Sequence, residues 1–388
     1  YKENYFPLMI NCTGRKIGVF QEIQTRILNI QKLREKIASA LNISESAGAV
    51  PLFDAKKLSG RTQKQLRVAA IMDRFTLDCF RPECELTELT PEGWRQEVEQ
   101  ARPDLLFIES AWEGKDGLWH GKINHCSAEV RALAEFCHEQ RIPVVFWNKE
   151  DPIYTDVFME TARLADVVFT TDIERIQKYK TELGHERVYH LHFAAQPVTH
   201  NPIEKYDRKD KFCFAGAYYH RYEKRCRVFD AFAEYFQQTR GLDIYDRNYP
   251  SPRPEHKFPE QYDPCILGRL DPSEIDVAYK GYRFGINMNS VVQSQTMFAR
   301  RVFELLACNT VVIGNYSRGI KNYFGDLTIC TDDAKTLKTA MEQYCADTDT
   351  EDRYRLLGLR KVLAEHLCED RLDSIVKKVY GVSVKPAL

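Results

Sequence analysis

The feature that most constrains this fold is an alternation of short β-branched or apolar runs with helical stretches along most of the 388 residues. Such an alternation is typical of parallel sheets that helices cover on both faces. A loop rich in proline near 196–202 divides the runs into two series, so the sequence predicts an α/β protein with two doubly wound, Rossmann-like domains. The predicted strands are 66–73, 85–89, 104–110, 143–148, 167–171 and 187–193, then 211–215, 242–245, 284–288, 310–314 and 327–331.

The same pattern predicts three segments: a helical extension and linker over 1–62, and the two Rossmann-like domains over 63–200 and 201–388. Apolar residues at spacings of three and four predict a helix over 18–42, which either packs on its own domain or mediates self-association. The chain begins with Tyr1 instead of Met, which leaves open the alternative that it is a segment of a larger polypeptide.

Charge and composition exclude several classes of protein. Lys plus Arg (55) balance Asp plus Glu (56), which gives a net charge of −1 and no global field for nucleic acid or anionic lipid. No stretch approaches the roughly 18 to 20 apolar residues of a membrane span, so a cytoplasmic location is expected, with contact at the inner face of a membrane left open. The twelve cysteines form no CxxC pair, and Asp347 and Asp349 lie in an acidic loop, so no metal site is predicted.

The segment 287–324 holds the richest set of candidate ligands. Here a predicted strand is followed by a polar loop and then a helix, at the carboxyl edge of the sheet, where free amides and the helix dipole favour phosphate. Hydroxyls and arginines can bind a diphosphate, and a carboxylate can accept hydrogen bonds from ribose. An exposed salt bridge within the helix is the alternative. The candidate donor ligands are Ser290, Ser294, Thr296, Arg300, Arg301 and Glu304.

A second candidate motif for the donor begins the second domain. Gly216 follows a predicted strand and would let the backbone approach a phosphate, or it is an ordinary turn glycine. Tyr219 and Arg225 begin the next helix. Arg225 can reach a diphosphate, or it pairs with a carboxylate on the surface.

The run of residues 298–313, followed by Asn315, Ser317 and Arg318, resembles the C-terminal half of GT-B glycosyltransferases. It is most similar to the bacterial group related to spore-maturation glycosyltransferases. The resemblance implies that Glu304 contacts the donor ribose and that Arg301 is the motif arginine. Asn309 stands where the family has Gly, and Asn tolerates a positive φ better than most residues.

This resemblance covers roughly residues 66–375 and leaves the N-terminal 62 residues outside. It implies a GT-B architecture, in which the two domains face a central cleft. The domain over 63–200 would then bind the acceptor, and the domain over 201–388 would bind a nucleotide-sugar donor.

The first domain supplies the candidate residues for the acceptor and for catalysis. Two tryptophans beside glycines and acidic groups follow one predicted strand, and aromatic faces beside carboxylates commonly bind sugars. An inverting transferase needs a base for the acceptor hydroxyl, and Glu113 is favoured because its neighbours would shield it from water. The predicted acceptor-binding residues are Trp112, Trp119 and Asn148, and the candidate catalytic carboxylates are Glu113, Asp73 and Glu150.

The sequence thus predicts a bacterial enzyme of polysaccharide biosynthesis that needs neither a metal nor a bound cofactor. It would move a sugar from a nucleotide-diphosphate donor, of the UDP type, to a carbohydrate or glycoconjugate acceptor. Arginines and helix dipoles would stabilise the leaving diphosphate. A nucleotide-sugar epimerase on the same fold and a non-catalytic sugar- or nucleotide-binding module are the alternatives, because fold alone does not fix function.

Overall fold

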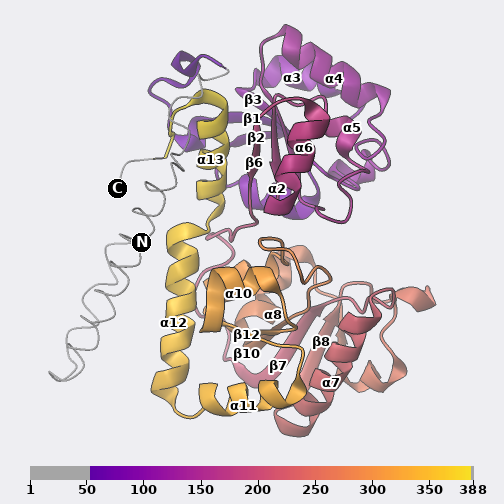
Figure 1. The fold of residues 1–388 in the computed structure, drawn as a ribbon, viewed down its shortest axis with the longest axis vertical. Helices are drawn as coiled ribbons and strands as arrows, with labels where there is room; N and C mark the ends of the chain where they lie inside the picture. Colours follow the sequence, from indigo (N-terminus) through magenta and orange to yellow (C-terminus); the bar gives the residue numbers. More distant parts are fainter. Residues whose placement is uncertain (1–52, 386–388) are drawn as a thin grey trace, which may run out of the picture. The chain divides into compact units, whose positions relative to one another are not determined.

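The structure is a computed structural model that describes residues 53–385. The helix predicted over 18–42 and its role in self-association lie outside these residues. The described chain forms two α/β domains, each built on a sheet of six parallel strands, which confirms the predicted fold class (Figure 1).

The first domain contains the sheet with strand order β2-β1-β3-β4-β5-β6. All six predicted strands of this series are present. The strands are β1 (Arg67–Ile71), β2 (Glu85–Glu88), β3 (Leu105–Glu109), β4 (Val144–Asn148), β5 (Val167–Thr170) and β6 (Val188–His190), and the helices are α2 (Arg74–Phe80), α3 (Trp94–Ala101), α4 (Ala128–Glu139), α5 (Met159–Ala162) and α6 (Ile176–Leu183).

The second domain contains the sheet with strand order β12-β11-β10-β7-β8-β9. The short edge strand β9 was not predicted. The strands are β7 (Lys209–Gly216), β8 (Leu242–Asp246), β9 (Ile266–Gly268), β10 (Tyr282–Asn287), β11 (Val311–Gly314) and β12 (Ile329–Cys330), and the helices that follow them are α7 (Glu223–Thr239), α8 (Ile275–Lys280), α9 (Arg301–Ala307), α10 (Arg318–Phe324), α11 (Ala334–Tyr344) and α12 (Thr348–Glu365).

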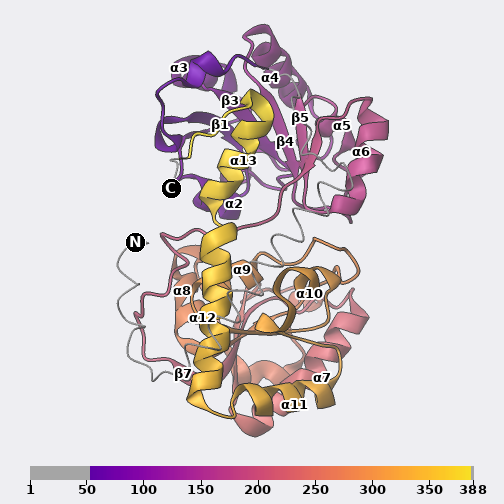
Figure 2. The ribbon, with the colours of Figure 1, turned by 60° about the vertical axis from the view of Figure 1, so that its left-hand side comes forward.

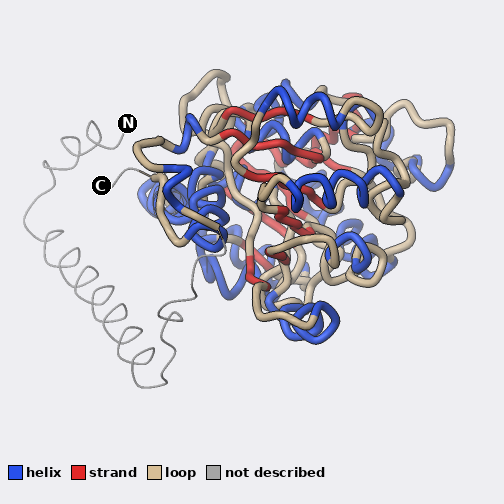
Figure 3. Tube along the Cα trace, turned by 90° about the horizontal axis from the view of Figure 1, so that it is seen from above, coloured by secondary structure: helices blue, strands red, loops and turns tan. Residues whose placement is uncertain are grey.

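Both faces of each sheet are buried, which explains why the strands are apolar throughout. Along β1, Ala69 and Ile71 lie in one hydrophobic cluster, whereas Val68 and Ala70 lie in another. Successive side chains of a strand point to opposite faces, so two apolar clusters require helices on both sides. Figure 3 shows the strands between layers of helices.

The last helix returns to the first domain. Helix α13 (Cys368–Tyr380) packs on the first sheet, and its Ile375 and Val379 are fully buried there. In Figures 1 and 2, α12 runs beside the second domain and α13 beside the first. The sequence pattern had placed this helix with residues 201–388. The structure differs because the buried face of α13 is complementary to the first sheet.

The order of strands places one switch point in each sheet. In the first sheet the chain reverses direction between β1 and β3, and in the second between β7 and β10. Ligands of open parallel sheets bind beyond the carboxyl ends of the strands at such points. The loops after β1, β3, β7 and β10 are therefore the places to look for a site.

Candidate active site

Gly216 ends β7 at the switch point of the second sheet. A Cβ there would lie 2.7 Å from the ring of Phe214 and 3.2 Å from a guanidinium nitrogen of Arg301. The absence of a side chain thus leaves room for the Arg301 guanidinium against the strand end. Asn287 ends the neighbouring strand β10, and both polar atoms of its fully buried side chain lack a hydrogen-bond partner.

Two arginines lie beside this glycine without an acidic partner. Arg225 of α7 is only 6% exposed, and its one hydrogen bond donates to the carbonyl of Ala217 at 3.1 Å. Among residues 53–385, neither Arg225 nor Arg301 forms an ion pair, and the Nε of each is buried and unpaired. Burial, together with the positive charge of Arg301, lowers the pKa of Arg225 to about 10. Two uncompensated cations at a strand end are the electrostatic condition for binding an anion.

Glu304 of α9 is buried and already has partners. It is 1% exposed, accepts a hydrogen bond from the Tyr279 hydroxyl at 2.8 Å, and forms an ion pair with Arg300. Burial opposes its charge, yet the pKa of Glu304 is lowered because Arg300, and then His200, stabilise the carboxylate. Glu304 is therefore an ionised acceptor held in place before any ligand arrives.

Arg300 joins the two domains. Its guanidinium lies 4.0 Å from the ring centroid of Phe75 in α2 of the first domain, within the range of a cation–π contact. Helix α9 begins at Arg301, so Arg300 stands at its N-cap. Arg300 thus holds Glu304 and contacts the first domain at once.

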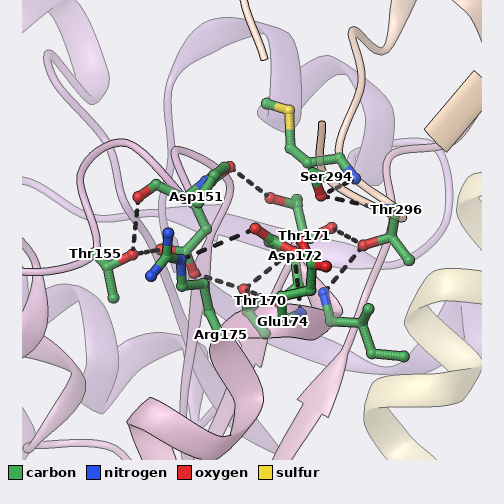
Figure 4. A network of polar contacts seen from close by, with 12 residues as sticks. Asp151, Thr155, Thr170, Thr171, Asp172, Glu174, Arg175, Ser294 and Thr296 are labelled. Atoms are coloured by element: carbon green, nitrogen blue, oxygen red, sulfur yellow. Dashed lines mark hydrogen bonds and ion pairs between the residues drawn. The ribbon is translucent and has the colours of Figure 1, made fainter. Parts of the chain in front are cut away.

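The hydroxyls of the loop before α9 are largely engaged by the protein. Ser294 accepts a hydrogen bond from the amide of Met297 at 2.9 Å. Thr296 donates to the carbonyl of Thr171 at 2.8 Å and accepts from the amide of Ile173 at 3.0 Å, both in the first domain (Figure 4). Thr296 therefore connects the domains, and its hydroxyl is not free for a phosphate.

Ser290 is the one of the three predicted loop hydroxyls that remains half-exposed at the end of the second sheet. Its position, just beyond β10 at the switch point, is compatible with the predicted role, which stays a prediction.

At the switch point of the first sheet, Asp73 stabilises a loop. Its carboxylate accepts hydrogen bonds from the amides of Trp112, Glu113 and Gly114 at 2.9–3.1 Å, and from the Lys149 ammonium at 2.6 Å. Burial would raise its pKa, but Lys149 and these amides lower it. A carboxylate so fully engaged is a poor proton acceptor, so the geometry favours a structural role for Asp73.

Lys149 also neutralises a second acid, Glu109, at the end of β3. Glu109 is fully buried, pairs with Lys149 and accepts a hydrogen bond from Thr76 at 2.9 Å. Burial raises the pKa of Glu109 to about 7 despite the neighbouring ammonium. The pKa of Lys149 is raised, because two carboxylates outweigh its burial.

Three of the residues predicted for the acceptor side and catalysis are placed differently from the expectation. Trp119 is 0% exposed, and its indole donates to the carbonyl of Leu89 at 2.8 Å, so it is a core residue and does not line a surface. Asn148 is fully buried and donates to Asp151 and Tyr179, so its amide is occupied. Glu113 is exposed to solvent, so the shielded setting expected for it is absent.

A network of buried hydrogen bonds around Asp151 connects the carboxyl ends of β4 and β5. Asp151 accepts hydrogen bonds from the hydroxyls of Thr155 and Thr170, both at 2.6 Å (Figure 4). Burial raises the pKa of Asp151 to about 6. This network holds the strand ends that carry residues 148–151.

Glu150 and Trp112 do come together. Burial raises the pKa of Glu150, while Lys149 and a hydrogen bond from Trp112 oppose that shift. Trp112 is half-buried, with its ring 5.1 Å from that of Tyr154. Of the three carboxylates, Glu150 alone is both partly shielded and not consumed by backbone amides.

The sequence-based search missed the second-domain residues that face this pair. Arg247 lies close enough to lower the pKa of Glu150, and Arg221 interacts with the Tyr154 hydroxyl. Both arginines surround Tyr219, which was predicted as a donor ligand. Nothing in the sequence places Arg247 beside Arg221, because Arg221 precedes α7 and Arg247 follows β8.

Other expectations concern single features. Asn309 has φ 57°, a left-handed conformation that Asn tolerates better than most residues, while its place at a family glycine stays a prediction. Within the described residues, no group of three or more His, Cys, Asp or Glu side chains is arranged to hold a metal ion. That the protein needs neither a metal nor a cofactor stays a prediction.

No helix in residues 53–385 is long and apolar enough to cross a membrane.

Comparison with known proteins agrees with this geometry. Residues 213–377 match the family described as glycosyl transferase-like. The spore protein CgeB of Bacillus subtilis is 23% identical over 181 residues, which are 43% of this chain and 54% of that protein. The chain thus spans about half the length of this curated relative.

Two solved structures are similar to this chain. Anabaena HepE, solved in complex with UDP and glucose, aligns over 81% of this chain and 99% of its own, with a TM-score of 0.50 and 11% identity. A glycosyltransferase from Rickettsia africae aligns over 80% of this chain and 97% of its own, with a TM-score of 0.49 and 9% identity.

The chain therefore has the GT-B fold, and its residues 213–377 are similar to the glycosyl transferase-like family. Arg225, Arg301 and Glu304 all lie within the matched residues 213–377 of the second domain. The resemblance predicted from the sequence is confirmed at this level.

Proposed function

We propose that this protein transfers a sugar from a nucleotide-diphosphate donor to a carbohydrate or glycoconjugate acceptor. The observation that carries the proposal is the pair of unpaired, converging guanidiniums, Arg225 and Arg301, beside Gly216 at the switch point of the family-matched domain. A diphosphate would supply the negative charge that these groups lack. In the transition state they would stabilise the charge that develops on the leaving diphosphate.

Glu304 would accept hydrogen bonds from the ribose hydroxyls. Its ionised state and its fixed position, set by Tyr279 and Arg300, favour this role because no reorganisation is needed when the donor binds. UDP is the proposed nucleotide, since the related HepE structure is described in complex with UDP and glucose.

Glu150 is the proposed base for the acceptor hydroxyl, and Trp112 beside it would pack against the acceptor sugar. A carboxylate whose pKa is raised by burial takes up a proton more readily at neutral pH than an ordinary one. This choice replaces the preference for Glu113, which is exposed to solvent.

The proposal is tested with a thermal-shift panel of UDP, GDP, ADP, TDP and CMP, followed by an assay with the sugar conjugate of the base that binds. A ligand at a hundred times its Kd stabilises the native state by about 2.7 kcal/mol. One nucleotide should raise the midpoint, and Glu304→Gln should weaken that response. Gln is preferred to Ala, because it keeps the side-chain volume and a hydrogen-bond acceptor beside Tyr279 and Arg300, although both variants remove the charge.

Catalysis is tested separately with Glu150→Gln. The variant should lose about 10²- to 10⁴-fold in kcat while retaining nucleotide affinity. If no nucleotide raises the midpoint, sugar transfer is not the function. If the sugar nucleotide is instead converted without an acceptor, the protein is an epimerase.

A further inference from the structure

The second domain places more arginines near Gly216 than the two, Arg225 and Arg301, that are proposed to bind the diphosphate. Arg225, Arg221 and Arg247 all surround the ring of Tyr219, with their guanidinium carbons 5.0, 5.9 and 5.7 Å from its centroid. Arg247 also donates a hydrogen bond to the Tyr219 hydroxyl. None of these arginines forms an ion pair within the described part of the chain. Like charges gathered around one ring repel one another, and an anion bound among them would relieve that repulsion.

The two outer arginines differ from the inner pair in their surroundings. Arg225 is buried and next to Arg301, whereas Arg221 and Arg247 are exposed. They belong to different elements: Arg221 precedes α7, and Arg247 follows β8. The fold therefore brings these two arginines together around the Tyr219 ring, since they are not neighbours in the sequence.

The outer arginines also face the first domain, where the acceptor is proposed to bind. The pKa of Arg221 is raised: burial opposes the charge, but the hydroxyls of Tyr222 and then Tyr154 outweigh it. Tyr154 packs against Trp112, and Arg247 influences Glu150. Glu150 and Asp246 are the carboxylates near Arg247, and neither forms an ion pair with it within the described part of the chain.

We propose that Arg221 and Arg247, arranged around Tyr219, form a second anion subsite that binds a carboxylate or phosphate group carried by one of the two sugar substrates. This inference rests on the proposed function and specifies it: the substrate at this position is acidic. Arginine suits the role because its planar fork of donors matches a carboxylate or phosphate in two-point hydrogen bonding.

The experiment compares acidic and neutral ligands that are otherwise alike. Calorimetry would measure UDP, UDP-glucose against UDP-glucuronate for a group on the donor, and glucose against glucose 6-phosphate for a group on the acceptor. The protein is the full chain, as wild type, Arg221→Gln/Arg247→Gln, and Arg225→Met. Arg227→Gln, an exposed arginine of α7, is the matched control.

The wild type should bind the acidic member of one pair at least tenfold more tightly than the neutral member, and that pair identifies the source of the charge. The double variant should lose this preference and keep its UDP affinity within twofold. Arg225→Met should lose UDP affinity instead, and the control should change neither.

Two results would overturn the subsite. One is equal binding of acidic and neutral ligands in both pairs by the wild type. The other is a loss of UDP affinity in the double variant as large as that in Arg225→Met, which would make all these arginines one diphosphate site. Because glucose 6-phosphate needs no nucleotide, its tighter binding than glucose would support the subsite even if no nucleotide binds and the proposed function fails.

Discussion

The two switch points of this molecule treat charge in opposite ways. At the first, Lys149 is shared by Glu109 and Asp73, and Asp73 also accepts three backbone amides. At the second, Arg225 and Arg301 are held at the strand end without a carboxylate. Polar groups that satisfy one another stabilise loops, whereas buried charges left unpaired are costly to the fold and gain their partner from a ligand. The charged groups at the first switch point, called the first edge below, therefore stabilise the fold. Those at the second switch point, the second edge, are arranged to bind a ligand.

The largest expected effect tests the first edge. Lys149→Met removes the only ammonium between two carboxylates while keeping most of the side-chain volume, and should lower the free energy of unfolding by about 3–5 kcal/mol. Urea denaturation measures it. Lys122→Met, which breaks an ion pair of half-exposed side chains with Glu129, should cost less than about 1 kcal/mol.

Adding Glu109→Gln to Lys149→Met should restore part of the loss, since it removes one of the two buried negative charges. A loss below 1 kcal/mol in Lys149→Met, or no recovery in the double variant, would show that the first edge is not held by this charge network.

The second prediction concerns Arg225, a buried cation that, unlike Lys149, has no acidic partner within residues 53–385. Arg225→Met should leave the unliganded protein as stable as the wild type or more so, because it removes an unpaired buried cation. The same variant should lose roughly 30- to 100-fold in UDP affinity, which corresponds to about 2–3 kcal/mol. Thermal unfolding without and with UDP separates the two effects. A variant that is destabilised yet binds UDP normally would reverse the assignment of the two edges.

These contrasts mark the limit of what the sequence could predict. The strands other than β9 and the helix with Arg301 and Glu304 follow from apolar patterning and a local motif, so they were predictable, whereas the strand order that creates the switch points was not predicted. Three other features depend on partners distant in the chain. They are the hydrogen bonds that occupy the Asp73 carboxylate, the burial of Trp119 and the packing of α13 on the first sheet. A local pattern reports residue types at a strand end, but not which of them already have partners.

The third prediction concerns the contact between the two edges. Thr296→Val leaves the carbonyl of Thr171 and the amide of Ile173 without their shared hydroxyl, and should cost about 1–2 kcal/mol in stability. Because the hydroxyl is consumed by this contact, UDP affinity should change less than in Arg225→Met. Thr296→Ser should recover most of the loss. Thr336→Val, at an exposed helix start, is the control and should cost only a few tenths of a kcal/mol. A large loss of UDP affinity with unchanged stability would return Thr296 to the donor site.

The smallest expected effect is at Glu113, the carboxylate that the sequence alone favours as base. Its side chain is exposed, and its one side-chain partner given by the structure is the His120 ring nitrogen at 3.1 Å. Exposed pairs of this kind contribute little, so Glu113→Gln should change stability by less than about 0.5 kcal/mol and kcat by less than about twofold. Glu150→Gln, assayed in parallel, should lose most of the activity. If the two variants behave the other way round, the acceptor hydroxyl is deprotonated from the exposed loop that Asp73 holds, and the first edge is then catalytic as well as structural.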